Sequence, residues 1–383
     1  MTVSQVPSNL VRSTASETPK YGNSIEITDI LQILSDTPYA CSTIQRLSGG
    51  VVNATYHGVL SRPLTDGSSE IIVKVSEDFA SLSAPIELPA SRSIKEFAVL
   101  EALNMGLSPV IRYDGLTVRP PCPYWLSSEH HLQVMENLPN TIDLSKYFLT
   151  PAGGAISDHY ASSIGRALGL WLRAFHAKTS EESHLTYLKA VGRNVMNRTA
   201  MYSFYLSRLE QNIAGFPHIF CELGETIVSY VTKKLECEKG ESPGLIHGDL
   251  SIRNILISES AHKLTGLMLA PIDWEMYHYG QQHQDIGQLI GDLCILKMFK
   301  ALDVCGIILE NLAASYEIAN DDVAFDIVSH IGIQMISWAF ISAAGCSKDE
   351  EEQLLTFARD LIIKGHERDR EWLAKSPLGC LFN

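Results

Sequence analysis

The pattern of apolar residues changes once along this chain, near residue 137, and this change constrains the fold more than any other feature. Before it, short apolar or alternating runs predict strands, with two helices among them. After it, apolar residues recur at the three- and four-residue spacing of long amphipathic helices. We therefore predict an α+β protein of two lobes, a small β-rich N-lobe and a larger helical C-lobe.

The boundaries of this organisation follow from the same patterns. Residues 1–24 are rich in Ser, Thr, Pro and Asn and predict a flexible tail, residues 25–137 the N-lobe and residues 138–383 the C-lobe. In the N-lobe we expect helices at Ser24–Ser35 and Ser91–Leu103, and strands at Thr43–Leu47, Val51–Leu60, Ile71–Val75, Tyr124–Leu126 and Leu132–Met135. In the C-lobe we expect long helices that include Ser157–Lys178, Thr199–Asn212, Leu223–Glu236 and Gln288–Lys300.

Charge and composition limit the classes of partner. The net charge of -14 disfavours nucleic acid and anionic membranes as general ligands, and a cationic or neutral small molecule suits this chain better. The eight cysteines form no CxxC pair, so neither a zinc site nor a disulfide framework is indicated. Without a secretory signal or a long apolar run, we expect a cytoplasmic protein, either a monomer or a homodimer.

The most informative segment is Leu245–Ile257, LIHGDLSIRNILI. Apolar triplets at both ends predict two short strands that hold a polar loop between them. Phosphoryl transfer requires a carboxylate beside the attacking hydroxyl and oxygen ligands for magnesium. Asp249 and Asn254 can divide these two tasks on one loop.

A second apolar segment that ends in acidic residues, Ala270–Glu275, follows about 20 residues after the first, a distance that fits a hairpin between them. A carboxylate at the end of a strand that pairs with the first segment would reach the same site. Asp273 is therefore a candidate magnesium ligand, because hard cations prefer carboxylate oxygens.

The order HGDxxxxN followed by IDWE resembles the aminoglycoside phosphotransferase and choline kinase superfamily, over roughly residues 40–365. Residues 46–53 and 273–280 are especially similar to fungal hydroxytryptamine kinases, relatives of methylthioribose kinase. The resemblance implies a bilobal protein-kinase-like fold, ATP and Mg²⁺ as cofactors, and a hydroxyl of a small molecule as acceptor, such as a cationic amine or a hydroxylated indole of fungal specialised metabolism. It implies Asp249 as catalytic base, Asn254 and Asp273 as metal ligands, and Glu275 as a further direct or water-mediated ligand.

The nucleotide site is assigned through the same resemblance. A turn of Ser48, Gly49 and Gly50, with Asn53 after it, matches the loop that covers the phosphates. Lys74 lies in an apolar strand and is expected to pair with Glu96 and the ATP phosphates, although a lysine on an edge strand could also face water. Backbone groups from Glu136 to Leu138 match the hinge that binds adenine.

Several residues near these motifs allow two interpretations of their role. Asp285 matches a position that braces the catalytic loop, and it could equally be a helix N-cap. We expect His247 to orient the loop by hydrogen bonds, with Arg253 as a further supporting residue of the site. Trp274 and Tyr277 either line the acceptor pocket or pack between the lobes.

A small-molecule acceptor is favoured over a protein acceptor. Only 11 residues separate Asp273 from Asp285, which leaves no room for the activation segment of a protein kinase. The alternatives are a phosphotransferase that inactivates an antibiotic or toxin, and a catalytically silent nucleotide-binding protein. The intact set of Lys74, Glu96, Asp249, Asn254 and Asp273 argues against the silent protein.

Overall fold

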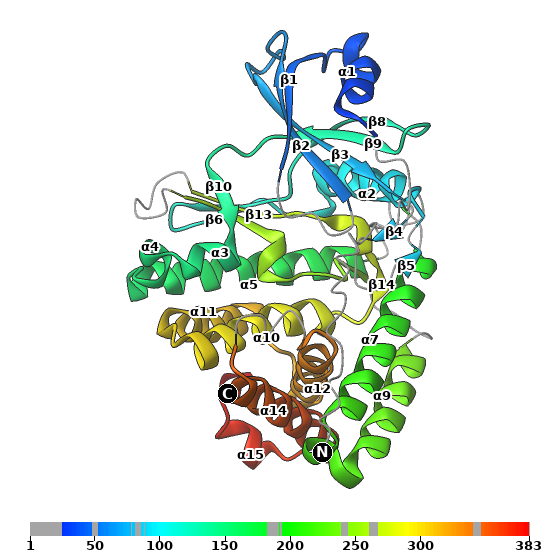
Figure 1. Cartoon of the computed structure of the whole chain (residues 1–383). Helices are drawn as coiled ribbons and strands as arrows, with labels where there is room; N and C mark the ends of the chain where they lie inside the picture. The colour runs from blue at the N-terminus through cyan, green and yellow to red at the C-terminus, as the bar shows by residue number, and fades with distance from the viewer. Residues whose placement is uncertain are drawn as a thin grey trace, which may run out of the picture.

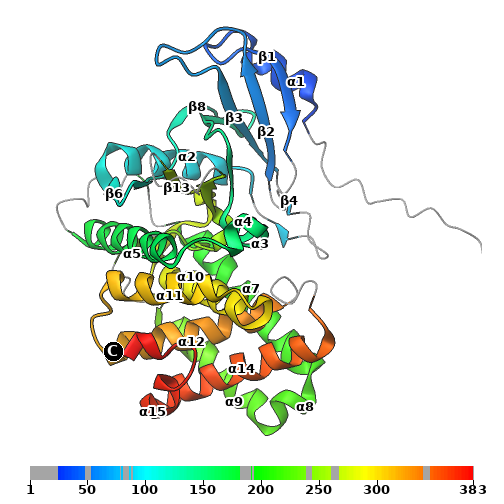
Figure 2. The same ribbon diagram turned by 90° about the vertical axis from the view of Figure 1, so that its left-hand side faces the viewer.

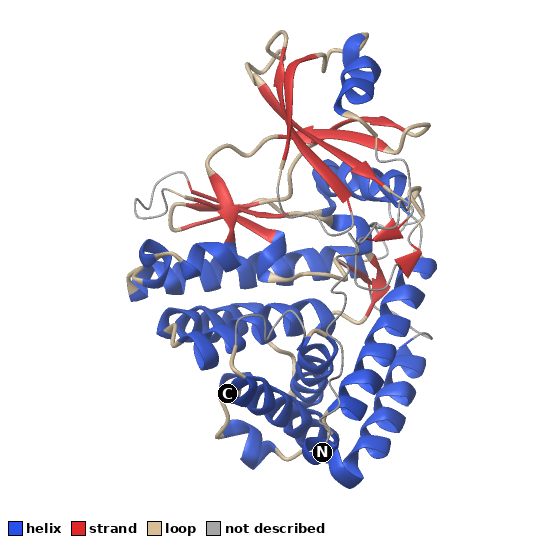
Figure 3. Cartoon of the chain, viewed as in Figure 1, coloured by secondary structure: helices blue, strands red, loops and turns tan. Residues whose placement is uncertain are grey.

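The structure, a computed structural model, describes residues 25–47, 53–77, 79–80, 86–87, 89–181, 191, 194–238, 244–259, 267–339 and 346–382. Strands gather at one end of the molecule and long helices at the other (Figures 1 and 3). The predicted α+β architecture with a small β-rich lobe and a larger helical lobe is confirmed.

The N-lobe is built on a five-stranded antiparallel sheet with the order β1-β2-β3-β9-β8. Helix α1 covers part of this sheet, and its buried Ile30 and Leu34 join Tyr56, Val73 and Val134 in a separate small core. The elements of this lobe are α1 (Ile27–Ser35), β1 (Cys41–Arg46), β2 (Asn53–Leu60), β3 (Glu70–Ser76), β4 (Phe79–Ala80), β5 (Ile86–Glu87), α2 (Arg92–Ala102), β8 (Pro123–Ser127) and β9 (Leu132–Glu136).

A second sheet connects the lobes and carries part of the candidate site. Its order is β10-β12-β13-β7-β6, with β13 and β7 parallel. Its strands are β6 (Ile111–Tyr113), β7 (Leu116–Val118), β10 (Thr141–Asp143), β12 (Ile255–Ser258) and β13 (Leu267–Pro271). Strands from before and after residue 137 thus share one sheet. The boundary between the two lobes at residue 137 stays a prediction.

The helical lobe consists of layered helices, with α5, α10, α12 and α14 following one another away from the second sheet (Figures 1 and 2). Within the part of the chain that the structure describes, no helix is long and apolar enough to cross a bilayer. The elements are α3 (Leu144–Leu149), α4 (Pro151–Gly154), α5 (Asp158–Ser180), α7 (Val195–Gly215), α8 (Pro217–Phe220), α9 (Gly224–Glu238), β11 (Gly244–Ile246), β14 (His278–Gly280), α10 (His283–Lys300), α11 (Asp303–Tyr316), α12 (Asp321–Ser337), α14 (Lys348–Glu367) and α15 (Arg370–Ala374).

Most predicted elements are found within a few residues of their expected bounds. Helix α5 begins where Ser157 accepts a hydrogen bond from the backbone N–H of Tyr160, as an N-cap should. Helix α10 begins at His283, five residues before the predicted start. The prediction missed the first turn because His283, Gln284 and Asp285 are polar and show no apolar period, although all three are buried. Strands β6, β7 and β10 were not predicted, since three residues are too few to show a period.

An aromatic cluster around Trp171 of α5 gives a stability prediction. The ring of Trp171 stacks on Phe175 at 5.6 Å and meets Trp274 edge-on at 6.3 Å, and its Nε1 donates to Ser108 Oγ at 3.1 Å. We expect Trp171→Ala to lower the free energy of unfolding by about 3–5 kcal/mol, because it leaves a large cavity. Urea denaturation measures this change, and Met105→Ala, at a side chain that is 68% exposed, should change it by less than about 0.5 kcal/mol.

Candidate active site

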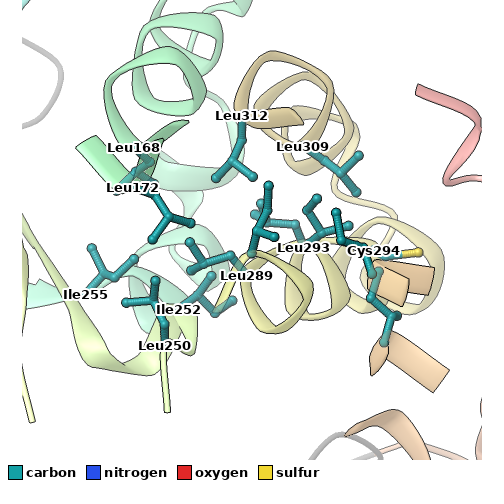
Figure 4. Packing of buried hydrophobic residues seen from close by; sticks show 14 of the residues in the cluster. Leu168, Leu172, Leu250, Ile252, Ile255, Leu289, Leu293, Cys294, Leu309 and Leu312 are labelled. Atoms are coloured by element: carbon teal, nitrogen blue, oxygen red, sulfur yellow. The ribbon is translucent and has the colours of Figure 1, made fainter. Parts of the chain in front are cut away.

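The loop between β11 and β12 is anchored by its apolar residues. Leu250, Ile252 and Ile255 are buried and lie close to α5 and α10, where Leu172 and Leu289 belong to the same core (Figure 4). Two polar residues of this loop, Asp249 and Asn254, are only partly buried. The alternation of apolar and polar residues therefore fixes the loop in the core and leaves the side chains of Asp249 and Asn254 accessible.

Gly248 makes the turn in this loop. Its φ of 80° lies in the left-handed region that glycine adopts without strain, and a Cβ there would collide with the carbonyl oxygen of Met276. Only glycine fits this position well.

His247 orients the loop, as the sequence suggested. Its Nε2 donates to the Ile272 carbonyl at 2.9 Å, and its Nδ1 accepts from the Asp249 backbone N–H at 3.3 Å. Burial lowers the pKa of His247, which favours the neutral ring that this pair of bonds needs. The histidine thus connects the loop to the strand that precedes Asp273.

Asp285 braces the same loop from α10. Its buried carboxylate accepts the backbone N–H groups of His247 at 2.8 Å and Gly248 at 3.0 Å. It also accepts from His176 Nε2 at 3.1 Å, while His176 Nδ1 bonds the Tyr316 hydroxyl at 2.9 Å. Burial alone would raise the pKa of Asp285, but the bond from His176 holds it below its usual range. The alternative role of N-cap is not seen, because the residue before α10 is Gln282.

This bracing gives a testable prediction. We expect Asp285→Asn to lower the free energy of unfolding by about 1–3 kcal/mol, because the neutral amide cannot satisfy both backbone donors and His176. If the brace also positions the loop, kcat should fall while the affinity for ATP stays unchanged. Thermal unfolding and initial rates measure the two effects. Asp303→Asn, the same change at an exposed position in the first turn of α11, serves as control and should leave both unaltered.

Asp249 and Asn254 lie in direct contact. The Asn254 Nδ2 donates to Asp249 Oδ2 at 3.0 Å and to the Asp249 carbonyl at 2.9 Å. Burial, and then the negative charge of Asp273, raises the pKa of Asp249 to about 7. A carboxylate with a pKa near neutrality is suited to act as a general base.

Asp273 follows β13 and adopts the left-handed conformation at φ 65°. The backbone N–H of Ile272 donates to the Asn254 carbonyl at 2.9 Å, which holds the segment beside the catalytic loop. The Asp273 carboxylate forms an ion pair with Lys74. The Nζ of Lys74 also donates to Glu96 Oε1 at 2.8 Å. Burial opposes ionisation of Asp273, but the Lys74 ammonium holds its pKa below the usual range.

Glu96 is the most enclosed of these acids. Besides Lys74, it accepts from Gln133 Nε2 at 2.5 Å and from the Trp274 backbone N–H at 3.1 Å. The predicted pair of Lys74 and Glu96 is therefore present, and Lys74 does not face water, since its side chain is only 9% exposed.

An all-oxygen group of acids suits a hard divalent cation. One carboxylate oxygen each from Glu96, Asp273 and Glu275 lies within 4.8 Å of the others. Asp273 pairs with Lys74 but is the accessible member, with 34% of its side chain exposed. Glu96 and Glu275 are almost fully buried, and each accepts from at least two protein donors. Asp273 and Asn254 therefore fit the role of magnesium ligands better than the two glutamates.

Two further residues of the expected nucleotide site contact protein groups. The side-chain amide of Asn53 donates to Glu275 Oε2 at 2.7 Å and accepts from Ser76 Oγ at 2.9 Å, so it does not point freely into a phosphate site. Glu136 is bound by both terminal nitrogens of Arg119, at 2.6 and 2.5 Å. Its side chain thus connects the end of β9 to the segment after β7. The Leu138 carbonyl accepts from Thr141 Oγ1 at 2.7 Å, and Ser48, Gly49 and Gly50 lie outside the described residues.

The aromatic residues after Asp273 are not where a pocket wall would place them. Trp274 is fully buried against Trp171 and Phe175, and its Nε1 donates to the Pro271 carbonyl at 3.0 Å. Tyr277 is also fully buried, with its hydroxyl donating to the Val191 carbonyl at 2.7 Å. Of the two alternatives, the contacts agree with packing, because residues next to a partly exposed aspartate can still point inward. Arg253, in the loop between β11 and β12, is exposed.

Sequence reasoning missed Arg92, Gln133 and Arg119. One local signal was available for Arg92: a basic residue in the first turn of a helix is unfavourable for the helix dipole and so requires another reason. Gln133 and Arg119 carry no such signal, because their partners are distant in sequence.

Comparisons with known proteins show the family of this chain. The sequence profile described as the phosphotransferase enzyme family (APH) matches residues 43–314. The phosphotransferase FrzJ of a Cladobotryum species is 29% identical over 366 residues, which cover 92% of this chain and 95% of that protein. The 4-hydroxytryptamine kinase of Psilocybe cyanescens is 26% identical over 67% of this chain and 69% of its own.

A second 4-hydroxytryptamine kinase, from Psilocybe cubensis, is 22% identical over 85% of this chain and 87% of its own. Among solved structures, the amicoumacin kinase hAmiN in complex with AMP-PNP, Ca²⁺ and Ami aligns with a TM-score of 0.48 at 14% identity, over 90% of this chain and 97% of that one. The family profile extends from β1 to α11 and so spans more than half of the sequence. The chain therefore belongs to the phosphotransferase enzyme family.

Proposed function

We propose that this chain is an ATP-dependent kinase that transfers the γ-phosphate of ATP to a hydroxyl group of a small molecule, in the cytoplasm. The observation that carries the proposal is the convergence of two segments. Asn254 donates to Asp249 on one segment, and Ile272, beside Asp273, donates to Asn254 from the other. Kinases need these groups together, because catalysis of phosphoryl transfer is mostly positioning and charge stabilisation.

In this proposal Asp249 accepts the proton of the acceptor hydroxyl. The bond from Asn254 Nδ2 to Asp249 Oδ2 fixes the carboxylate and leaves Oδ1 for the substrate. The acceptor oxygen forms its bond to the γ-phosphorus as the bond to the bridging oxygen of ADP breaks. Asn254 and Asp273 would hold Mg²⁺, which supplies positive charge at the phosphate oxygens.

The nucleotide is held by the N-lobe. Lys74, kept in place by Glu96, offers its ammonium to the phosphates, and backbone groups between Glu136 and Leu138 bind adenine. We assign the turn of Ser48, Gly49 and Gly50 to the phosphates because glycine allows backbone N–H groups to approach an anion.

The acceptor is proposed to be a cationic amine or a hydroxylated indole of fungal specialised metabolism. The net charge of -14 suits a cationic or neutral acceptor. Two relatives named 4-hydroxytryptamine kinase add to the support.

A transfer assay tests the proposal. The protein is incubated with ATP, Mg²⁺ and pools of amines, sugars, aminoglycosides and hydroxylated indoles, and products are detected by mass spectrometry. We expect the mass of one phosphate group to appear on an amine or indole that bears a hydroxyl. Phosphorylation confined to aminoglycosides would instead indicate an antibiotic-inactivating enzyme, and the absence of any phosphorylated product in all pools would count against the proposal.

A further inference from the structure

Arg92, at the start of α2, is a buried arginine whose three nitrogens all donate. Its side chain is 1% exposed. Nε donates to Glu275 Oε2 at 2.8 Å, Nη2 to Asn53 Oδ1 at 2.9 Å, and Nη1 to the carbonyls of Glu77 at 2.5 Å and Pro89 at 3.3 Å. A guanidinium held by so many acceptors has little freedom to move.

Glu275 is the only carboxylate among these acceptors. Its side chain is 3% exposed, and the same Oε2 that accepts from Arg92 also accepts from Asn53 Nδ2. If this carboxylate turned away from Arg92 to bind a metal ion, the buried ion pair between them would be broken, which is strongly unfavourable. The contacts therefore hold Glu275 for Arg92.

The charges of the neighbouring groups lead to the same conclusion. The direct ion-pair partners of Lys74 are Glu96 and Asp273, whereas Glu275 pairs directly with Arg92. Arg92 and Glu275 form a separate pair beside this group. Of the three clustered acids Glu96, Asp273 and Glu275, Asp273 is the one with an accessible carboxylate. One carboxylate with an amide oxygen from Asn254 is a sufficient protein contribution for Mg²⁺, which keeps several waters.

The pair also connects elements that must keep their relative positions. Arg92 belongs to α2, Glu275 to the short turn after Asp273, and Asn53 to the first position of β2. Asn53 in turn accepts from Ser76 Oγ at the end of β3. The strand that carries Lys74, the strand after the expected phosphate loop and the metal-binding segment thus meet at one guanidinium.

We infer that Glu275 is not a metal ligand but the partner of Arg92 in a positioning pair, which fixes the segment of Asp273 against β2 and α2. This inference rests on the proposed function, because it concerns the Mg²⁺ and ATP site of that kinase. It makes Arg92 and Glu275 positioning residues, with Asp273 and Asn254 as the protein ligands of the metal.

The test compares Glu275→Gln, Arg92→Met and the double variant. Glutamine keeps an oxygen that can accept from Arg92 and from Asn53, but it removes the negative charge that makes a carboxylate a strong ligand of Mg²⁺. ATP binding is measured by calorimetry at a series of Mg²⁺ concentrations, and unfolding is measured without nucleotide. Glu101→Gln on α2 and Arg62→Met are matched controls, because both side chains are exposed.

We expect Glu275→Gln to leave the Mg²⁺ concentration for half-maximal ATP binding within about threefold of wild type, because the glutamine oxygen still accepts from Arg92 and Asn53 and so keeps the segment of Asp273 in place. Loss of a metal ligand should instead raise this concentration by about tenfold or more. Arg92→Met should weaken ATP binding and lower the unfolding temperature, and the double variant should be no less stable than Arg92→Met alone. If Arg92→Met does not fold, Arg92→Lys replaces it.

A rise of tenfold or more in the Mg²⁺ requirement of Glu275→Gln, without a similar rise in the arginine variant, would overturn the inference. Additive losses of stability in the double variant would also overturn it. If the wild type binds no nucleotide, the proposed function fails instead, and the coupling between Arg92 and Glu275 in unfolding still decides whether they act as a pair.

Discussion

Asp249→Asn is expected to lower kcat by about 10²–10⁴-fold while the affinity for ATP and Mg²⁺ changes little. The amide cannot take up the hydroxyl proton, but it can still accept the hydrogen bond from Asn254 Nδ2 that holds the wild-type carboxylate at 3.0 Å. Steady-state rates with an identified acceptor measure the loss, and calorimetry measures nucleotide binding.

The control for this prediction is Asp349→Asn, an identical change at an exposed position on α14, which should leave kcat unchanged. The unfolding temperature of Asp249→Asn should not fall, because burial and Asp273 already disfavour the charged form of Asp249. A variant that still turns over at more than about a tenth of the wild-type rate would show that Asp249 is not the base.

Asp273→Asn is expected to have the second large effect, a fall of about 10²–10³-fold in kcat/KM for ATP. The carboxylate is the accessible member of the acidic group and pairs with Lys74, so its removal weakens the metal site and leaves the ammonium with Glu96 alone. The effect is measured as the rate at increasing Mg²⁺, which should not recover to the wild-type value at saturation.

This loss must be separated from a loss of folding. Removing one partner of a buried ion pair costs about 3–5 kcal/mol, although the partial exposure of Asp273 should make the cost smaller here. Urea denaturation without nucleotide therefore accompanies the rates. Full activity of a folded Asp273→Asn variant at ordinary Mg²⁺ would contradict the assignment of Asp273 as ligand.

Sequence reasoning reached the parts of this protein that local patterns encode. Asp249, Asn254 and Asp273 could be located because apolar residues on both sides predict strands, and short strands joined by hairpins bring such residues together. Their contacts, through Asn254 Nδ2 and the Ile272 backbone, agree with that expectation.

The remaining parts depend on contacts between distant segments. The partners of Arg119 and Gln133 lie 17 and 37 residues away, and no local period indicates them. Trp274 was assigned an alternative place in the acceptor pocket because it follows Asp273, but adjacent residues in an irregular turn can face opposite directions. The inward direction of Trp274 depends on Phe175 and Trp171 of α5, which the sequence cannot place beside it.

The same limitation explains the expectation for Glu275. Glu275 lies two residues after Asp273, at a position that resembles that of a second metal ligand in the superfamily. Its carboxylate instead accepts a hydrogen bond from Arg92, 183 residues earlier in the chain. A buried counter-charge can therefore change the task of an acidic residue without changing the motif around it.

A crystal structure with Mg²⁺ and a non-hydrolysable ATP analogue tests the central claim most directly. We expect one Mg²⁺ with oxygens of Asn254 and Asp273 at about 2.0–2.1 Å, the terminal phosphate between the metal and Asp249, and Glu275 still bound to Arg92. A nucleotide bound elsewhere, or a metal ion that contacts neither Asn254 nor Asp273, would contradict the account.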